Sequence, residues 1–221
     1  MNRKKITIIS IIAGFILLAI AGVIVGRNLI YKKNAKDCQL VIQKLYFASS
    51  MAASRIHDNW MEYIFDDKHY IDLNNGKMYK FPYSSYNFPE GHHSAYCYDI
   101  TDVVQETSDY LDDLTVTDTI KNLYYTSKRL MTKMTPAPSR YRTVNYNITQ
   151  LFHAVEELYD CAVSPDGNLE SYTKSINSSS SDYKKYSSQV EIEFGDADPV
   201  ELTTFLFTIQ LMFSMELPNR E

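Results

Sequence analysis

Apolar side chains along this chain recur mostly at helical spacing. The first run begins at Ile6, ends at Gly26 and contains no charged residue. After Asp37, apolar residues return at steps of three and four, which places them on one face of an α-helix expected to end near residue 66. This face comprises Val41, Leu45, Ala48, Ala52, Ile56, Trp60 and Tyr63. Because no Pro or Gly lies between residues 27 and 75, the uncharged run is predicted to continue into this helix with little or no break.

The uncharged run has the length of a membrane span. A helix over residues 6–26 rises about 31 Å, and the hydrocarbon core of a bilayer is about 30 Å thick. We therefore expect a short N-terminal tail (1–5), a transmembrane helix (6–26) and a basic juxtamembrane segment (27–36). A cleaved signal peptide with Ala19-Ile20-Ala21 as its small-residue site is the alternative, and it is disfavoured because the apolar run continues through Val25.

The charges that flank this run nearly balance. Three basic residues precede it and four follow it, up to residue 36. Because short basic tails usually stay in the cytoplasm, the predicted topology is a single-pass protein of the cell membrane. Its N-terminus is then cytoplasmic and its C-terminal domain extracytoplasmic.

Three further helices are expected to complete an antiparallel bundle. The second starts near Asp99 and is interrupted at 114–119, where β-branched residues lower helix propensity. The third follows two prolines and starts with Ser139 as its N-cap. A turn at 164–168 joins it to the fourth. The predicted fold class is all-α, with a bundle of about four helices over residues 37–195.

Residues 67–98 differ in character and are expected to form an insertion. Short β-prone segments flank Asn75-Gly76, which predicts a hairpin with a tight turn. Two later prolines, Pro82 and Pro89, are incompatible with a continuing helix. Irregular segments on a rigid scaffold often carry function, so this insertion is the expected place for a specific surface.

The C-terminal segment (196–221) leaves two alternatives open. Residues 190–194 and 200–217 alternate as strands do, yet 200–217 is unusually long for a strand and so favours a helix. Asp198 and Pro199 fit an N-cap and a first helical position. The segment is expected to pack on the bundle or to lie at the bilayer interface.

The charge balance excludes one class of partner. Residues 1–36 contain seven of the 22 Lys and Arg residues and none of the 27 Asp and Glu residues. The remaining 15 basic residues face 27 acidic ones, a net charge of −12. A domain this acidic argues against nucleic acid, whose phosphates select Lys and Arg.

The three cysteines, Cys38, Cys97 and Cys161, allow several states. Because three is an odd number, at least one thiol is free or pairs between chains. One internal disulfide would suit an oxidising compartment, but the sequence does not choose among the pairings. Three buried, unreactive thiols are the other interpretation.

No catalytic motif is recognisable, and we expect neither an enzyme nor a cofactor. His92, His93 and Cys97 are weak candidates for metal ligands, since imidazole and thiolate suit zinc or copper. His153 and Glu157 stand four residues apart on the third helix and are expected to form an exposed pair.

Aromatic residues crowd the insertion. Tyrosines on a loop with prolines suit contact with proteins or glycans, because they offer a large, rigid and partly polar surface. The predicted interaction surface is Tyr79, Tyr83, Tyr86, Phe88, Tyr96 and Tyr98.

Several features occur together in a known kind of protein. A basic tail and one apolar helix precede Asn59-Trp60, Pro136-Ala-Pro138 precedes a helical hairpin, and Pro165-Asp-Gly-Asn-Leu169 forms its turn. Over residues 1–66 and 100–190 the chain resembles uncharacterised single-pass, membrane-anchored helical proteins of Gram-positive bacteria. The resemblance implies a small, surface-exposed helical domain and no particular chemistry.

The leading hypothesis is a membrane-anchored extracytoplasmic domain that acts as a non-enzymatic interaction or accessory protein for an unidentified protein partner. One alternative is a ligand-sensing bundle that relays its signal through a partner, because helical bundles bind small molecules between their helices. The other is a metal-binding protein that uses the insertion.

Overall fold

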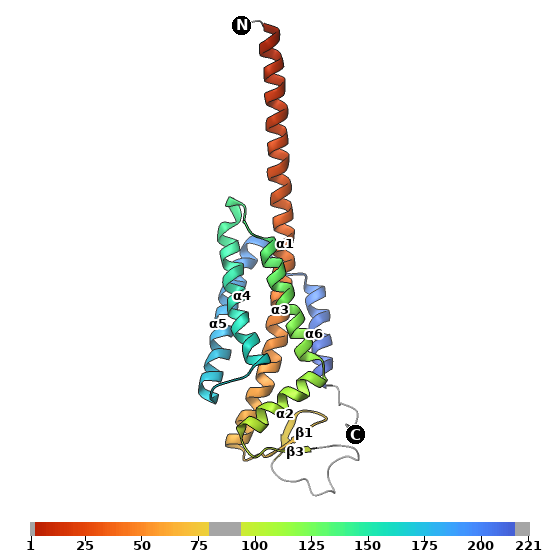
Figure 1. Cartoon of the computed structure of the whole chain (residues 1–221), viewed down its shortest axis with the longest axis vertical. Coiled ribbons are helices and arrows are strands. Elements are labelled where there is room, and N and C mark those ends of the chain that lie inside the picture. Colours follow the sequence, from red (N-terminus) through yellow and green to blue (C-terminus); the bar gives the residue numbers. More distant parts are fainter. Residues whose placement is uncertain (1–2, 80–93, 215–221) are drawn as a thin grey trace.

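The protein is a helical bundle with one helix much longer than the others (Figure 1). The computed structural model describes residues 3–79 and 94–214, with side chains from residue 16 onward. Within these ranges the helices are α1 (Arg3–Phe65), α2 (Ile100–Asp113), α3 (Val116–Lys133), α4 (Arg142–Val163), α5 (Leu169–Phe194) and α6 (Pro199–Ser214). The strands are β1 (Tyr70–Asp72), β2 (Lys77–Tyr79) and β3 (Ser94–Tyr96).

Helix α1 runs without interruption from the uncharged segment into the bundle, as the absence of Pro and Gly between residues 27 and 75 predicts. Its N-terminal part projects beyond all other elements (Figure 1). Apolar side chains there lie in the open: Leu17 is 67% exposed, Leu18 70% and Val23 71%. The first buried side chain of the described part is Tyr31.

Within the described part of the chain, no helix combines the length and the apolar character needed to cross a membrane. Residues 6–15 of the predicted membrane segment lie outside the residues whose side chains are described.

The core forms around the second half of α1, which contacts each of the other five described helices. Small side chains on α1, namely Ala35, Ala48, Ala52 and Ala53, are at most 1% exposed, so neighbouring helices approach closely. Larger apolar residues fill the spaces between these contacts. They include Ile42, Leu45, Ile56, Leu111, Ile120, Ile148, Leu151 and Leu158.

The predicted helix boundaries hold with one exception. The expected break in the second helix separates α2 from α3 at Thr115, which has a φ of 59°. Asn168 caps α5 through a reciprocal capping box, and the Asp198 carboxylate accepts hydrogen bonds from the first turn of α6. The prediction that Ser139 caps the third helix is wrong: Ser139 begins a 3₁₀ turn that ends at Tyr141, and α4 starts after it.

The C-terminal residues for which the sequence left strand and helix open are helical as far as the structure describes them. Residues 190–194 complete α5, and the apolar segment after Pro199 forms α6 alongside α1. Ile209 is the one fully buried side chain described in α6, whereas Phe207 is 62% exposed. Hydrogen bonding within α6 satisfies its backbone, which an isolated strand of this length would leave unpaired.

The predicted hairpin is present and gains a third strand. β1 pairs with β2 on one side and with β3 on the other, both antiparallel, in the order β2-β1-β3. Gly76 turns the hairpin at a φ of 65°, and a Cβ there would lie 2.5 Å from the Tyr110 ring. This turn therefore requires glycine for its backbone angle and for its contact with α2.

We expect Ile148→Ala to lower the free energy of unfolding by about 3 kcal/mol, because it removes buried methyl groups and leaves a cavity. Ile192→Ala, at a position 86% exposed on α5, is the matched control and should change it by less than about 0.5 kcal/mol. Denaturant unfolding of the full chain in detergent measures both. Equal losses would contradict the described core.

Candidate functional site

The sheet lies at the end of the bundle opposite the projecting helix (Figure 1). Three tyrosines form a row across it. Tyr70 pairs with Tyr79 on one neighbouring strand and with Tyr96 on the other, so the three share one register position. Residues at the same register position lie on the same face of a sheet. At the next position, Ile71 and Met78 face inward and are buried. The sheet therefore has an apolar inner face and an aromatic outer one.

The aromatic row continues through further ring contacts. The Tyr96 ring lies 4.9 Å from the Tyr70 ring and 4.8 Å from the Tyr98 ring, both edge-on. His69 lies between Tyr96, at 5.9 Å, and Tyr63 of α1, at 4.9 Å. Tyr98 is 81% exposed and Tyr96 43% exposed. The result is a connected aromatic surface of which part is open to solvent.

Hydrogen bonds attach this sheet firmly to the helices. The buried Asn59 of α1 donates through Nδ2 to the Gly76 carbonyl and to Thr107 Oγ1 of α2, each at 2.9 Å. Tyr63 donates to the Tyr98 carbonyl at 2.9 Å. Because these bonds join the hairpin, α1 and α2, the exposed rings stand on a rigid base.

The sequence-predicted interaction surface is brought together in part. Tyr79, Tyr96 and Tyr98 lie on or beside the sheet. The other three predicted members, Tyr83, Tyr86 and Phe88, lie outside the described residues. The sequence reasoning missed Tyr63, His69 and Tyr70. Strand pairing alone places Tyr70 in the row, and the alternation of Tyr70 and Ile71 was the signal that could have revealed it.

Of the three candidate metal ligands, Cys97 alone lies within the described residues. Cys97 is fully buried beneath the sheet, and its backbone N–H donates to the His69 carbonyl at 2.8 Å. His92 and His93 lie outside the described residues. In the described part, no group of three or more His, Cys, Asp or Glu side chains is arranged to hold a metal ion.

The histidine of α4 has a different partner from the one expected. His153 lies 3.2 Å from Glu156, whereas Glu157 was the predicted partner. Tyr124 of α3 also donates to Glu156, at 2.6 Å, and Lys128 lies 3.4 Å from it. Burial opposes ionisation, but the hydrogen bonds from Tyr124 and His153 and the charge of Lys128 outweigh it and hold the pKa of the Glu156 carboxyl below its usual value. We interpret this cluster as a link between α3 and α4.

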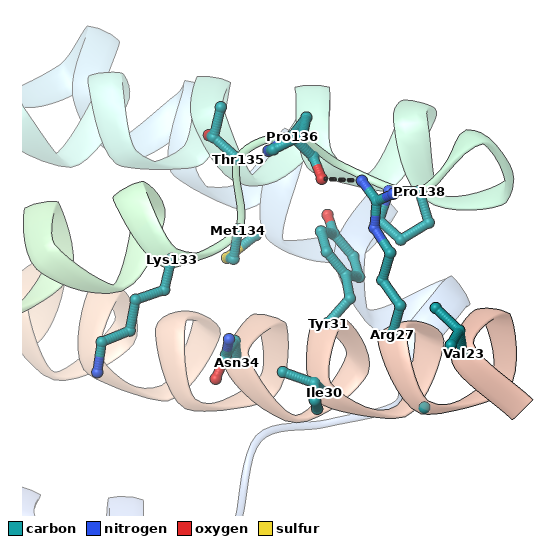
Figure 2. Close-up of a pocket in the computed structure, with 11 residues that line it drawn as sticks. Val23, Arg27, Ile30, Tyr31, Asn34, Lys133, Met134, Thr135, Pro136 and Pro138 are labelled. Carbon is teal, nitrogen blue, oxygen red and sulfur yellow. Dashed lines mark hydrogen bonds between the residues drawn. The ribbon is translucent and has the colours of Figure 1, made fainter.

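A pocket of about 690 Å³ lies where α1 enters the bundle. Figure 2 shows α1 on one side and the connection between α3 and α4 on the other. Arg27 reaches across to donate to the Pro136 carbonyl at 3.1 Å. Tyr31 donates to Asn145 Oδ1 at 3.0 Å and stacks on Tyr141 at 4.9 Å. These contacts fix the pocket walls.

A second open groove, of about 1030 Å³, runs between α1 and α5 at the other end of the bundle. Its lining is mainly apolar and includes Met61, Phe65 and Leu169, with His57 hydrogen-bonded to Thr173 at 3.0 Å. Hydrophobic side chains with few polar groups are typical of small-molecule sites, but this groove is shallow and open.

Comparison with protein-family models, with curated proteins and with solved structures finds no match to this chain. The functional argument therefore depends on the arrangement of its own residues.

All three cysteines are free and buried, and we expect none to react with a maleimide at pH 7.5 until the protein unfolds. Burial raises the pKa of the Cys38 and Cys97 thiols to about 12 and that of Cys161 to about 11, so almost no thiolate is present. Mass spectrometry should count no adducts in the native protein and three in denaturant.

The raised pKa values of the thiols also make the stability of the folded protein depend on pH. Because folding raises these thiol pKa values above 9.0, the free energy of unfolding from this source is constant below that pH and falls as the pH rises towards 12. A native adduct at neutral pH would contradict the described burial.

Proposed function

We propose that this protein is a single-pass membrane protein whose helical domain acts outside the cytoplasm as a non-enzymatic interaction or accessory protein. The observation that supports it is the arrangement along α1. One end of this helix projects with its apolar side chains uncovered, and the other end supports an exposed aromatic sheet.

The anchor is proposed to be the segment over residues 6–26. The large apolar side chains from Ile16 to Val25 are more than half exposed, so no other element among the described residues covers them. A soluble monomer rarely exposes so long an apolar surface, and a bilayer would bury it. The basic residues that follow, Arg27, Lys32 and Lys33, suit the headgroup region.

The second half of α1 acts as a spacer in this proposal. From Tyr31 to Phe65 the helix is continuous and rises about 50 Å. The tyrosine-rich sheet would therefore stand that far from the membrane, where a protein partner could reach it. Exposed tyrosines on a rigid base bind with little loss of side-chain entropy, which favours a contact surface.

The side of the membrane is a prediction that rests on the short basic N-terminal tail and on the charge of the domain. The domain beyond residue 36 has a net charge of −12, which would be repelled by the anionic cytoplasmic leaflet. An extracytoplasmic domain agrees with this charge.

Replacing Leu17 and Leu18 together with arginine should move the protein from the membrane pellet to the soluble fraction after alkaline extraction. Each arginine costs about 3 kcal/mol in the middle of a spanning helix. The matched control is Leu29→Arg, at a position 64% exposed but outside the predicted span. If the unchanged protein, the double variant and the Leu29→Arg control all stay in the membrane pellet, the proposed anchor is contradicted.

Protease treatment of intact cells, with an epitope after residue 221, reports the orientation in the same strains. Loss of the epitope without lysis places the domain outside. Protection, or an N-terminus that begins after Ala21 in the mature protein, would contradict the proposed topology.

The contact surface can be tested with a photo-reactive residue at the exposed Ser94 of β3. We expect a cross-linked protein adduct whose yield falls about tenfold with Tyr98→Ala, since buried tyrosines dominate many interfaces. Tyr125→Ala removes a tyrosine that is 64% exposed on α3 and should change nothing. Thermal unfolding should be unaffected by either substitution. Equal yields in both variants would place the contact elsewhere.

A further inference from the structure

We propose that the pocket at the base of the projecting helix binds the headgroup of an anionic phospholipid. The inference rests on the proposed membrane anchor and goes beyond it, because it assigns a lipid class to a particular site. The pocket lies between α1 and the connection from α3 to α4 (Figure 2).

The position of the pocket matches the depth of lipid headgroups. Val23 and Gly26, at the end of the apolar segment, form one edge, and Ile30 and Asn34 continue the same wall along α1. From Val23 to Asn34 the helix rises about 16 Å, so this wall begins within the predicted span and its next turns cross the headgroup layer, which is about 6 Å thick on each side of the hydrocarbon core. A lipid beside α1 would therefore place its phosphate next to this pocket.

The charge of the pocket is the opposite of the charge of the domain. Of the eleven described residues that line it, Arg27 and Lys133 are basic and none is acidic. The chain beyond residue 36 nevertheless has a net charge of −12. A cationic pocket in an acidic domain would select an anion, and it lies at the membrane-proximal end of the bundle.

One hydrogen bond holds the Arg27 side chain in place, and its guanidinium has further N–H donors for a ligand. Its Nη2 group donates to the Pro136 carbonyl at 3.1 Å, which orients the guanidinium towards the connection between α3 and α4. A guanidinium has five N–H donors in a planar fork that fits phosphate oxygens. Lys133, at the end of α3, is the second basic residue of the lining; it lies at the opposite edge of the pocket, with its ammonium group directed away from Arg27 (Figure 2).

The apolar lining distinguishes a lipid from a free phosphate. Val23, Ile30, Met134 and two prolines contribute to the pocket, and its edge continues into exposed apolar side chains of α1. Inorganic phosphate has no apolar surface to bury against these walls, so they would add no binding energy for it. The glycerol and upper acyl chains of a phospholipid would cover them, which adds hydrophobic burial to the contact with Arg27.

The test uses the full chain reconstituted in phosphatidylcholine vesicles that contain a spin-labelled phosphatidylglycerol or a spin-labelled phosphatidylcholine. Electron paramagnetic resonance gives the relative affinity of the protein for the two labelled lipids. We expect the unchanged protein to prefer phosphatidylglycerol. In the double variant R27Q/K133Q this preference should fall about fivefold for each of the two charges removed. The matched control is K32Q/K33Q, which removes two exposed charges of α1 that do not line the pocket.

The outcomes distinguish a specific headgroup site from non-specific electrostatic attraction between the protein and anionic lipid. A larger loss in R27Q/K133Q than in K32Q/K33Q, unaffected by millimolar inorganic phosphate, supports the headgroup site. Equal losses in the two variants would mean diffuse electrostatic attraction and would overturn it. Displacement of the labelled lipid by inorganic phosphate alone would overturn the choice of a lipid.

Flotation of the same vesicles distinguishes the two proposals. Protein that floats with the vesicles but shows no lipid preference overturns the headgroup site alone. Protein that fails to float overturns the membrane anchor and the headgroup site with it. Circular dichroism of both variants should match that of the native chain, because all four side chains are exposed at the surface.

Discussion

The structure depends on the continuity of one helix. Helix α1 contacts each of the other five described helices, and its small buried residues, such as Ala48 and Ala52, let them approach closely. The same helix leaves the bundle without a break. The projecting part and the centre of the core therefore belong to one continuous backbone hydrogen-bond ladder. Helix α1 is therefore part of both the projecting segment and the core of the domain.

The part of α1 that lies in the bundle is held at its two ends by different kinds of contact. At the end near the projecting segment, Tyr31 stacks on Tyr141 and Arg27 bonds to the Pro136 carbonyl. At the far end, the buried Asn59 joins the hairpin and α2 through two hydrogen bonds. Buried polar groups of this kind fix a single arrangement, because leaving one unpaired costs more than a misplaced apolar contact. Both proposed contact surfaces thus lie beside specific polar links.

Local sequence signals predicted most of the elements. The Asn75-Gly76 turn, the turn at 164–168 and the pair Asp198-Pro199 each specify a backbone angle or a hydrogen bond within a few residues, so their structures follow from the sequence nearby. Ser139 shows the limit of this reasoning. Its chemistry suits a helix N-cap, but the chain first makes a 3₁₀ turn in which Tyr141 is buried against the core, and α4 begins only after it.

Periodicity, turn residues and composition are enough to predict the helical class, the hairpin, most of the helix boundaries and the division of charge from the sequence. Tertiary structure alone decided which distant residues meet. Strand pairing placed Tyr70 between Tyr79 and Tyr96, and it buried Cys97 beneath them. Helix packing joined Arg27 to Pro136, 109 positions away, and so formed a cationic pocket. Such contacts depend on the relative placement of whole elements, which no local pattern encodes.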